Sequence, residues 1–290
     1  MSRVSRVSRA FTRAKEERRA ALIVYVCAGD PSLEVTERLV HRLVESGADI
    51  IELGVPFSDP IADGPVIQAA SERALAAGTT LRRILTMVKR LRDQGLDAPL
   101  ALMSYLNPIH ALGEPAIGSV ADAGIDALIL PDVPYDEAPP WRAAIEAAGM
   151  DLVGLAAPTT DEARLRAIGA SSSGFLYYVS VTGVTGVRAA LPESLPSQLR
   201  AARAASRVPV AVGFGVDSPA QARALAAHAD GVIVGSAVVQ HLHGPDGEAT
   251  ALAFVRALAE ALHESRTDSA LAASSHPTSS LSPLSEVTPC

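Results

Sequence analysis

The segment ADIIELGVPFSDPIADGP, residues 48–65, contains the unit that repeats through this chain. A short apolar run with the composition of a β-strand is followed by a loop that three prolines stiffen. Glu52 lies inside the apolar run, where an ionised carboxylate loses its hydration unless a partner compensates for the loss. Glu52 is therefore expected to form a structural ion pair or to take part in chemistry.

Similar apolar, β-branched runs recur, and each is followed by a loop and a stretch with helical periodicity. The eight runs begin near Ala21, Ala48, Pro99, Asp126, Asp151, Gly174, Val208 and Gly231. The helical stretches are residues 33–46, 81–94, 137–148, 161–169, 196–205, 219–227 and 251–264, with an extra short helix at 66–75. Strands that are apolar on both faces and alternate with helices indicate a parallel sheet. Eight such units predict an α/β fold, a single-domain (β/α)8 TIM barrel, rather than an open doubly wound sheet.

The two ends of the chain differ in composition from the barrel. Residues 1–10 are expected to be a flexible N-terminus, residues 11–264 the catalytic barrel, and residues 265–290 a disordered tail rich in Ser, Pro and Thr. The start is rich in Arg and Ser, and its first acidic residue is Glu16. A transit peptide is one interpretation, but a frayed terminus that leads into a short amphipathic helix accounts for the pattern better.

Composition excludes several classes of function. The net charge of −7 argues against nucleic acid or an anionic membrane as a partner. No apolar run approaches the roughly 20 residues that a membrane span needs. The only cysteines, Cys27 and Cys290, do not make a disulfide framework, and this predicts a cytoplasmic protein. Cys27 is expected to be a small buried filler.

Active sites of such barrels lie at the carboxyl ends of the strands. Glu52 belongs to the second strand, Asp63 to the loop after it, and Asp132 follows the fourth strand. Glycine-containing loops follow the last three strands, at residues 183–186, 213–215 and 235–236. Glycine lets backbone amides approach a ligand closely, so these loops predict a phosphate site, although tight turns alone remain an alternative.

The chain lacks the residues that several other mechanisms need. Its two lysines, Lys15 and Lys89, fall outside the strands, which argues against a Schiff-base aldolase. Its histidines are not grouped at one rim, which argues against a metal site. The remaining candidates are Glu52 and Asp63 as general acid and base on a small phosphorylated substrate, with desolvation raising the pKa of Glu52. Asp59 and Asp63 have an alternative role in capping local turns.

Six segments together resemble the tryptophan synthase alpha subunit family. They are ELGVPFSDPIADGPVIQ (52–68), LMSYLNPI (102–109), LILPDVP (128–134), YYVSVTGVTGVR (177–188), VGFGVDSP (212–219) and GVIVGSAVV (231–239). The resemblance spans residues 11–262 in order. It implies retro-aldol cleavage of indole-3-glycerol phosphate to indole and D-glyceraldehyde 3-phosphate.

The resemblance also implies roles for individual residues. Glu52 matches the catalytic acid/base, and Asp63 matches the carboxylate that accepts the indole N–H. Thr185 matches a lid threonine that bonds this aspartate on closure. The matches to the phosphate site are Gly186, Phe214, Gly215, Gly235 and Ser236. The matches to the indole pocket are Tyr25, Leu102, Ile129 and Tyr177. The matches to the partner interface are Pro56, Asp59 and Pro60.

The family implies a partner as well as a reaction. Its alpha subunit passes indole to a pyridoxal-phosphate-dependent beta subunit in an αββα heterotetramer, and needs no cofactor of its own. Two alternatives stay open within the resemblance: a stand-alone indole-3-glycerol-phosphate lyase, and a catalytically silent activator of the beta subunit. Indole-glycerol-phosphate synthase, another phosphate-binding barrel, needs a strand lysine that this chain lacks.

Overall fold

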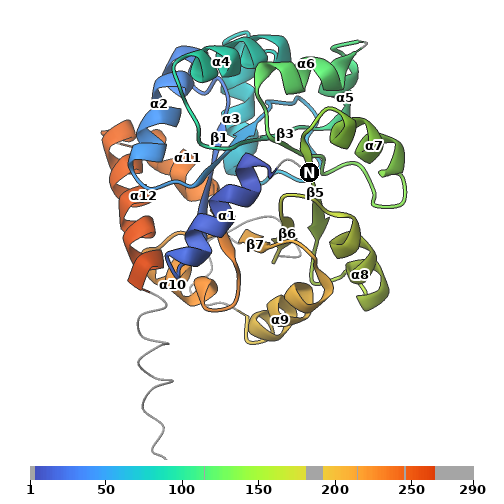
Figure 1. Cartoon of the computed structure of the whole chain (residues 1–290). Coiled ribbons are helices and arrows are strands. Elements are labelled where there is room, and N and C mark those ends of the chain that lie inside the picture. Colours follow the sequence, from blue (N-terminus) through green and yellow to red (C-terminus); the bar gives the residue numbers. More distant parts are fainter. Residues whose placement is uncertain (1–3, 114, 181–191, 214, 245, 265–290) are drawn as a thin grey trace, which may run out of the picture.

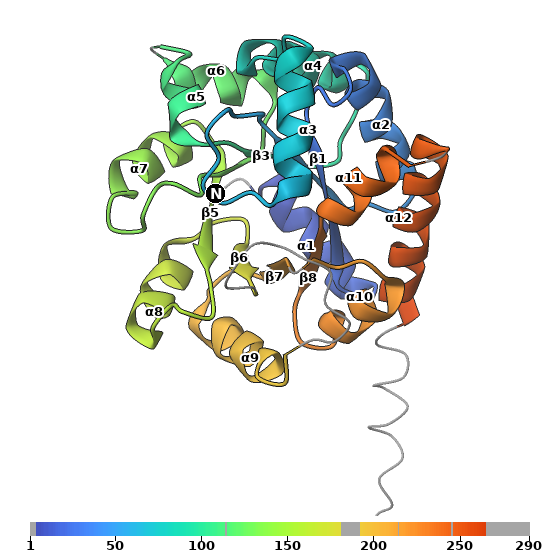
Figure 2. The same ribbon diagram turned by 180° about the vertical axis from the view of Figure 1, so that it is seen from behind.

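The computed structural model describes residues 4–113, 115–180, 192–213, 215–244 and 246–264. Eight parallel strands pair in sequence order and close into a barrel, because the last strand pairs with the first. The strands are β1 (Ala21–Cys27), β2 (Ile50–Gly54), β3 (Leu100–Met103), β4 (Ala127–Ile129), β5 (Asp151–Ala156), β6 (Leu176–Val179), β7 (Val210–Gly213) and β8 (Gly231–Val234). Helices surround them in both views (Figures 1 and 2). The predicted (β/α)8 barrel is confirmed.

Most helices follow the predicted periodic stretches. They are α1 (Arg6–Glu16), α2 (Leu33–Glu45), α3 (Pro65–Ala76), α4 (Leu81–Asp93), α5 (Leu106–His110), α6 (Ala116–Ala123), α7 (Pro139–Ala147), α8 (Glu162–Ser171), α9 (Leu195–Ala205), α10 (Pro219–Ala226), α11 (Ser236–Leu242) and α12 (Gly247–Glu264). The extra helix expected at 66–75 is α3. Helices α5, α6 and α11 were not predicted, because they are short and because α6 contains a glycine and α11 two valines, which favour helix only weakly.

Side chains along each strand alternate between the barrel interior and the layer under the helices. In β2, Ile50 belongs to the inner apolar cluster, whereas Ile51 and Leu53 belong to the outer one. Strand β2 pairs with β3 so that Glu52 lies opposite Ala101, another residue of the inner face. Because side chains alternate along β2, Glu52 points into the barrel like Ile50.

Helix α1 closes the amino end of the barrel. Its buried residues Val7, Ala10 and Phe11 join the inner cluster, and the Phe11 ring lies 5.6 Å from the ring of Phe175. In Figure 1 this helix lies across the barrel. The prediction of a flexible terminus over residues 1–10 is therefore wrong from Arg6 onward, because apolar residues of this segment fill the barrel end. The short amphipathic helix is confirmed, and the predicted tail at 265–290 lies outside the described residues.

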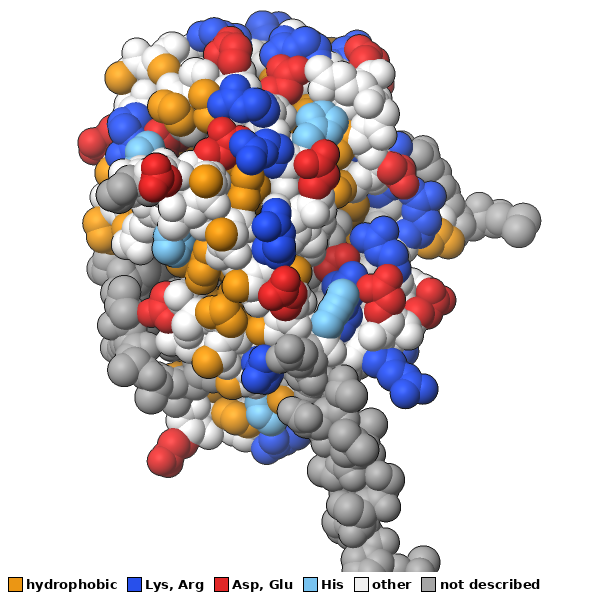
Figure 3. Space-filling model, turned by 90° about the vertical axis from the view of Figure 1, so that its left-hand side faces the viewer, with side chains coloured by type: hydrophobic (Ala, Val, Ile, Leu, Met, Phe, Trp, Pro, Cys, Tyr) orange, Lys and Arg blue, Asp and Glu red, His pale blue; other side chains and the backbone are white. Residues whose placement is uncertain are grey.

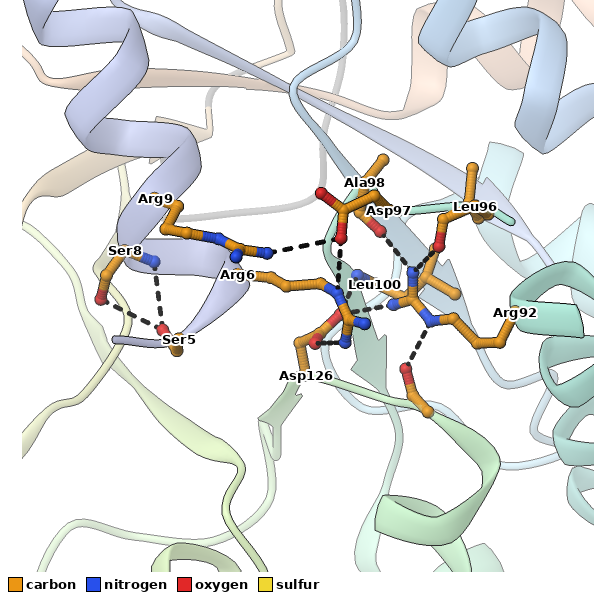
Figure 4. Close-up of polar contacts among 11 residues, drawn as sticks. Ser5, Arg6, Ser8, Arg9, Arg92, Leu96, Asp97, Ala98, Leu100 and Asp126 are labelled. Atoms are coloured by element: carbon orange, nitrogen blue, oxygen red, sulfur yellow. Dashed lines mark hydrogen bonds and ion pairs between the residues drawn. The ribbon is translucent and has the colours of Figure 1, made fainter. Parts of the chain in front are cut away.

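An ion-pair network fixes the same end (Figure 4). Arg6 of α1 and Arg92 of α4 both bond to the carboxylate of Asp126, at 3.0 and 2.5 Å. Asp126 also accepts a hydrogen bond of 2.8 Å from the backbone N–H of Leu100. A buried carboxylate that lost these partners would strongly destabilise the fold. Apolar residues of α1 therefore fill the amino end of the barrel and ion pairs stabilise it, so a binding site is expected at the carboxyl end.

The outer surface over α2 and α12 is charged and mixed in sign. Figure 3 shows basic and acidic side chains interspersed on this face. Arg38 and Arg42 of α2 pair with Glu248 of α12, and Arg90 of α4 pairs with Glu37. No helix in the described part of the chain is long and apolar enough to cross a membrane.

Candidate active site

A cavity of about 490 Å³ opens at the carboxyl ends of the strands. It brings together Glu52 from β2, Asp63 from the loop before α3, and the loops that follow β7 and β8. Its lining residues are Tyr25, Glu52, Ile61, Ala62, Asp63, Gly64, Ile67, Met103, Pro131, Leu155, Tyr177, Val179, Gly213, Gly215, Ile233, Gly235 and Ser236. The two acids and the glycine loops after β7 and β8, which the sequence singled out separately, therefore share one cavity.

Glu52 is completely buried, and neither carboxylate oxygen has a hydrogen-bond partner among the described residues. Burial raises the pKa of Glu52 to about 8, and the nearby Asp63 adds to the rise. The alternative of a structural ion pair finds no support, since no cation pairs with Glu52 in the described ranges. A carboxyl that is mostly protonated near neutral pH can donate a proton and then take one back.

Two glycines make room for two tyrosines beside Glu52. A Cβ on Gly54 would lie 2.1 Å from the hydroxyl oxygen of Tyr25, and one on Gly213 would lie 2.6 Å from that of Tyr177. Both rings can therefore lie across a strand inside the barrel. Burial raises the pKa of Tyr25 and of Tyr177 well above the usual value, so both hydroxyls stay neutral. They contribute apolar ring surface and a polar tip without charge.

Side chains from neighbouring elements hold the loop that carries Asp63. The N–H of Ala62 donates to the Tyr105 hydroxyl at 2.9 Å, and the Gln68 side chain donates to the Asp63 carbonyl at 2.8 Å. The ring of Tyr105 also lies 5.0 Å from that of Phe57. Burial raises the pKa of Asp63, and a hydrogen bond from Tyr105 opposes the rise. Tyr105 thus positions the acidic loop, a role that sequence reasoning missed, although an aromatic residue just after a strand was a signal.

Removal of the Tyr105 hydroxyl should therefore loosen Asp63. We expect Tyr105→Phe to lower kcat/KM about tenfold for the cleavage reaction that the family resemblance implies, because one or two hydrogen bonds are lost. The half-exposed Tyr135→Phe is the control and should change nothing. Steady-state kinetics of both variants checks this, and equal kcat/KM values for them would contradict it.

The predicted phosphate-binding residues fall partly within the described chain. Gly215, Gly235 and Ser236 line the cavity, and Gly215 has a φ of +38°, which favours glycine. Gly235 also lies close to Tyr25, because a Cβ on Gly235 would be 3.3 Å from the Cβ of Tyr25 and 3.4 Å from its ring. The predicted Gly186, Phe214 and Thr185 lie outside the described residues.

One of the predicted indole-pocket residues is misplaced. Tyr25 and Tyr177 line the cavity, but Leu102 does not: it packs in the outer cluster under the helices. The prediction for Leu102 is wrong because its neighbours Ala101 and Met103 occupy the inward positions of β3. Ile129 faces the barrel interior but belongs to the inner cluster rather than to the cavity lining. The residues that the sequence missed include Met103, Leu155, Ile67 and Ile233.

The different positions of Leu102 and Met103 predict that one substitution affects stability and the other affects substrate binding. We expect Leu102→Ala to destabilise the fold by about 2–5 kcal/mol while the KM stays within about twofold, because a buried outer-layer side chain is lost. Met103→Ala should instead raise the KM, because its side chain lines the cavity. Chemical denaturation and steady-state kinetics of both variants check this, and a raised KM in Leu102→Ala alone would contradict it.

The remaining predicted residues have simple positions. Pro56 is buried, so it is not at the surface where a partner could reach it, whereas Asp59 is exposed and Pro60 half-buried. The next residue, Ile61, is a large apolar side chain that is 78% exposed. The Asp132 carboxylate accepts the N–H of Leu106, which its two oxygens share at 3.1 and 2.9 Å, and thereby caps α5.

Cys27 is buried, and burial raises the pKa of its thiol to about 12, so it is an inert filler as predicted. Within the described ranges, no group of three or more His, Cys, Asp and Glu side chains is placed to hold a metal ion.

Comparisons with known proteins agree with one another. A family model described as tryptophan synthase alpha chain matches residues 11–267. A tryptophan synthase alpha chain of Geobacter sulfurreducens is 51% identical over 239 residues, which cover 82% of this chain and 90% of that protein. The crystal structure of tryptophan synthase subunit alpha from Legionella pneumophila superposes with a TM-score of 0.83 at 36% identity, covering 90% of this chain and all of that one. A chain of Mycobacterium tuberculosis tryptophan synthase gives a TM-score of 0.83 at 40% identity, covering 90% and 99%. The chain belongs to the tryptophan synthase alpha chain family.

Proposed function

We propose that this alpha chain cleaves indole-3-glycerol phosphate to indole and D-glyceraldehyde 3-phosphate through Glu52 and Asp63. The observation that carries the proposal is the fully buried Glu52 carboxyl, which has a pKa of about 8 and shares a cavity with Asp63. Its protonated form is the species that a general acid needs at neutral pH. Family membership supports the reaction, and the geometry of the cavity supports the choice of these two residues.

The proposed reaction is a carbon–carbon lyase step that balances around one proton. Glu52 donates its proton to C3 of the indole ring, which leaves a positive charge shared with the ring nitrogen. Asp63 accepts the ring N–H and stabilises that charge. The ionised Glu52 then takes the proton of the hydroxyl on the carbon bonded to C3. The bond to C3 breaks, its electron pair returns to the ring, and the aldehyde of glyceraldehyde 3-phosphate forms.

The shape of the cavity suits the two ends of this substrate. Tyr25, Tyr177, Met103 and Leu155 offer apolar surface for a flat aromatic ring. Gly215, Gly235 and Ser236 lie in the same cavity, where backbone amides suit a phosphate. Gly186 and Phe214 are proposed to complete the phosphate site, and Thr185 to belong to a lid that excludes water.

We further propose that indole passes to a beta subunit in a cytoplasmic αββα heterotetramer. The exposed part of the loop after β2, with Asp59, half-buried Pro60 and Ile61, is the proposed contact, since an exposed large apolar side chain favours an interface. Pyridoxal phosphate is proposed to reside only in the beta partner. Lys15 and Lys89 of this chain are exposed on α1 and α4, and neither lines the cavity.

The experiment is an assay of indole release from indole-3-glycerol phosphate, with and without a tryptophan synthase beta subunit. We expect release that increases when the beta subunit is present. Equally fast release by the chain alone would instead indicate a stand-alone lyase. No release under either condition would overturn the proposal and indicate a silent activator.

A further inference from the structure

Three polar side chains meet outside the cavity, and each comes from a different element. Asp30 lies in the loop after β1, Arg73 lies in α3, and His243 caps the end of α11. The Arg73 guanidinium binds the Asp30 carboxylate in a fork, with Nε–Oδ1 at 2.9 Å and Nη2–Oδ2 at 2.8 Å. The His243 Nε2 lies 2.7 Å from Asp30 Oδ2. We refer to these three residues as the Asp30 cluster.

The cluster is satisfied in either tautomer of His243. With its hydrogen on Nε2, His243 donates to Asp30, and with its hydrogen on Nδ1, it accepts from Arg73 Nη2 at 2.8 Å. The Asp30 side chain is only 4% exposed, whereas those of Arg73 and His243 are 41% and 34% exposed. A buried carboxylate held by a planar fork and an imidazole fixes both distance and direction.

The same three elements also build the cavity. Strand β1 contributes Tyr25, α3 begins two residues after Asp63, and α11 begins with Ser236 at the proposed phosphate end. Figure 2 shows α3 and α11 close together on the side of the barrel away from α1. A small apolar cluster lies among these elements, formed by Tyr25, Cys27, Ile67, Ala70, Ala74 and Val239. Any change in the angle between α3 and α11 therefore moves residues at the two ends of the cavity.

We propose that the Asp30 cluster is a positioning device that fixes the separation between the acid end and the phosphate end of the substrate cavity. Its residues touch no substrate and act through α3 and α11. The inference rests on the proposed function, because it assigns Asp63 and Ser236 to opposite ends of one bound molecule. The proline-containing loop holds Asp63 next to the start of α3. The Asp30 cluster connects α3, through Arg73, to the end of α11, through His243.

A positioning role predicts different effects on different ligands, whereas an ion pair that only stabilises the fold does not. A ligand that spans the cavity must satisfy both ends at once, so it depends on their separation. A ligand that fills one end does not. Loss of the cluster should therefore weaken the spanning ligand selectively and leave the two fragments unaffected.

The test measures dissociation constants of three probes for the full chain. The probes are indole, glycerol 3-phosphate, and an unreactive analogue in which a three-carbon chain joins an indole ring to a phosphate. We expect Arg73→Leu and His243→Leu to weaken the analogue about tenfold while each fragment stays within about twofold. His243→Gln, whose amide can still bond to Asp30, should restore binding, and Arg82→Leu on the exposed face of α4 should change nothing.

Two results would overturn the inference. One is an unchanged affinity for the analogue in His243→Leu, and the other is an equal loss for all three probes. His243→Leu is decisive if Arg73→Leu does not fold, because Arg73 still satisfies Asp30 in that variant. A wild-type chain that binds the analogue no more tightly than the fragments would overturn the proposed function and this inference with it. Tight wild-type binding with unaffected variants would overturn only the positioning role.

Discussion

Glu52→Gln should lower kcat for indole release by about 10³-fold while the substrate still binds, because glutamine keeps the shape of the side chain but cannot transfer a proton. The site of the substitution is completely buried and lies inside the substrate cavity. Single-turnover kinetics with indole-3-glycerol phosphate measures the chemical step directly. A substrate Kd within about threefold of the wild type is part of the expected result.

The matched control is Glu260→Gln, which changes an exposed glutamate on α12 and should leave kcat unchanged. If Glu52→Gln turned over at the rate of this control, Glu52 would not be the proton donor. A loss that appeared only in KM would contradict the assignment as well, since it would place Glu52 in binding rather than in chemistry.

The same substitution should stabilise the fold, and the gain should grow with pH. The folded-state pKa of Glu52 is about 8, against 4.5 without burial. Below pH 4.5 the carboxyl is protonated in both states and costs nothing. As the pH rises from 4.5 to 8, only the unfolded state releases the proton readily, so stability falls until it levels off above pH 8. Relative to the difference between variant and wild type at low pH, where Glu52 is protonated in both states, we expect Glu52→Gln to gain roughly 1 kcal/mol at pH 5, roughly 3 at pH 7 and roughly 5 at pH 9.

Chemical denaturation at these three pH values checks the prediction. A constant difference between variant and wild type would reflect packing and hydrogen bonding of the amide, so only the slope with pH reports the carboxyl. Glu260→Gln should show no such slope. A flat difference would mean that Glu52 ionises normally in the folded chain, and the proposed acid role would lose its physical basis.

Sequence reasoning predicted the architecture because the relevant signal repeats. Eight apolar runs, each followed by a helical pattern, are enough to indicate a closed parallel barrel, and the closed strand order agrees. The same reasoning missed α5, α6 and α11, whose short sequences carry little periodicity. It also predicted a flexible N-terminus as far as residue 10, whereas α1 begins at Arg6. The contacts of Val7 and Ala10 with the end of the barrel are tertiary, and they leave no local signal in the sequence.

The sequence predicts the two acids and the glycine loops of the candidate site, but it does not predict which strand side chains point into the barrel. Glu52 and Asp63 stand out because charged residues in an apolar run and in a stiff loop are unusual. The error at Leu102 arises because strands buried on both faces show no alternation, so their sequence does not reveal which residues point inward. Only the pairing of Glu52 with Ala101 settles that Met103, not Leu102, lines the cavity. The contacts of Tyr105 and of the Asp30 cluster are long-range, and a single sequence does not reveal them.

Proton transfer to C3 of indole can be followed without the cleavage reaction. The chain is incubated in D2O with indole and glycerol 3-phosphate, and the C3–H signal of indole is followed by proton NMR. If the buried Glu52 carboxyl delivers the proton, the wild type exchanges this hydrogen for deuterium, and Glu52→Gln does so about 100-fold more slowly or not at all. Exchange by Glu52→Gln at the wild-type rate would contradict the account.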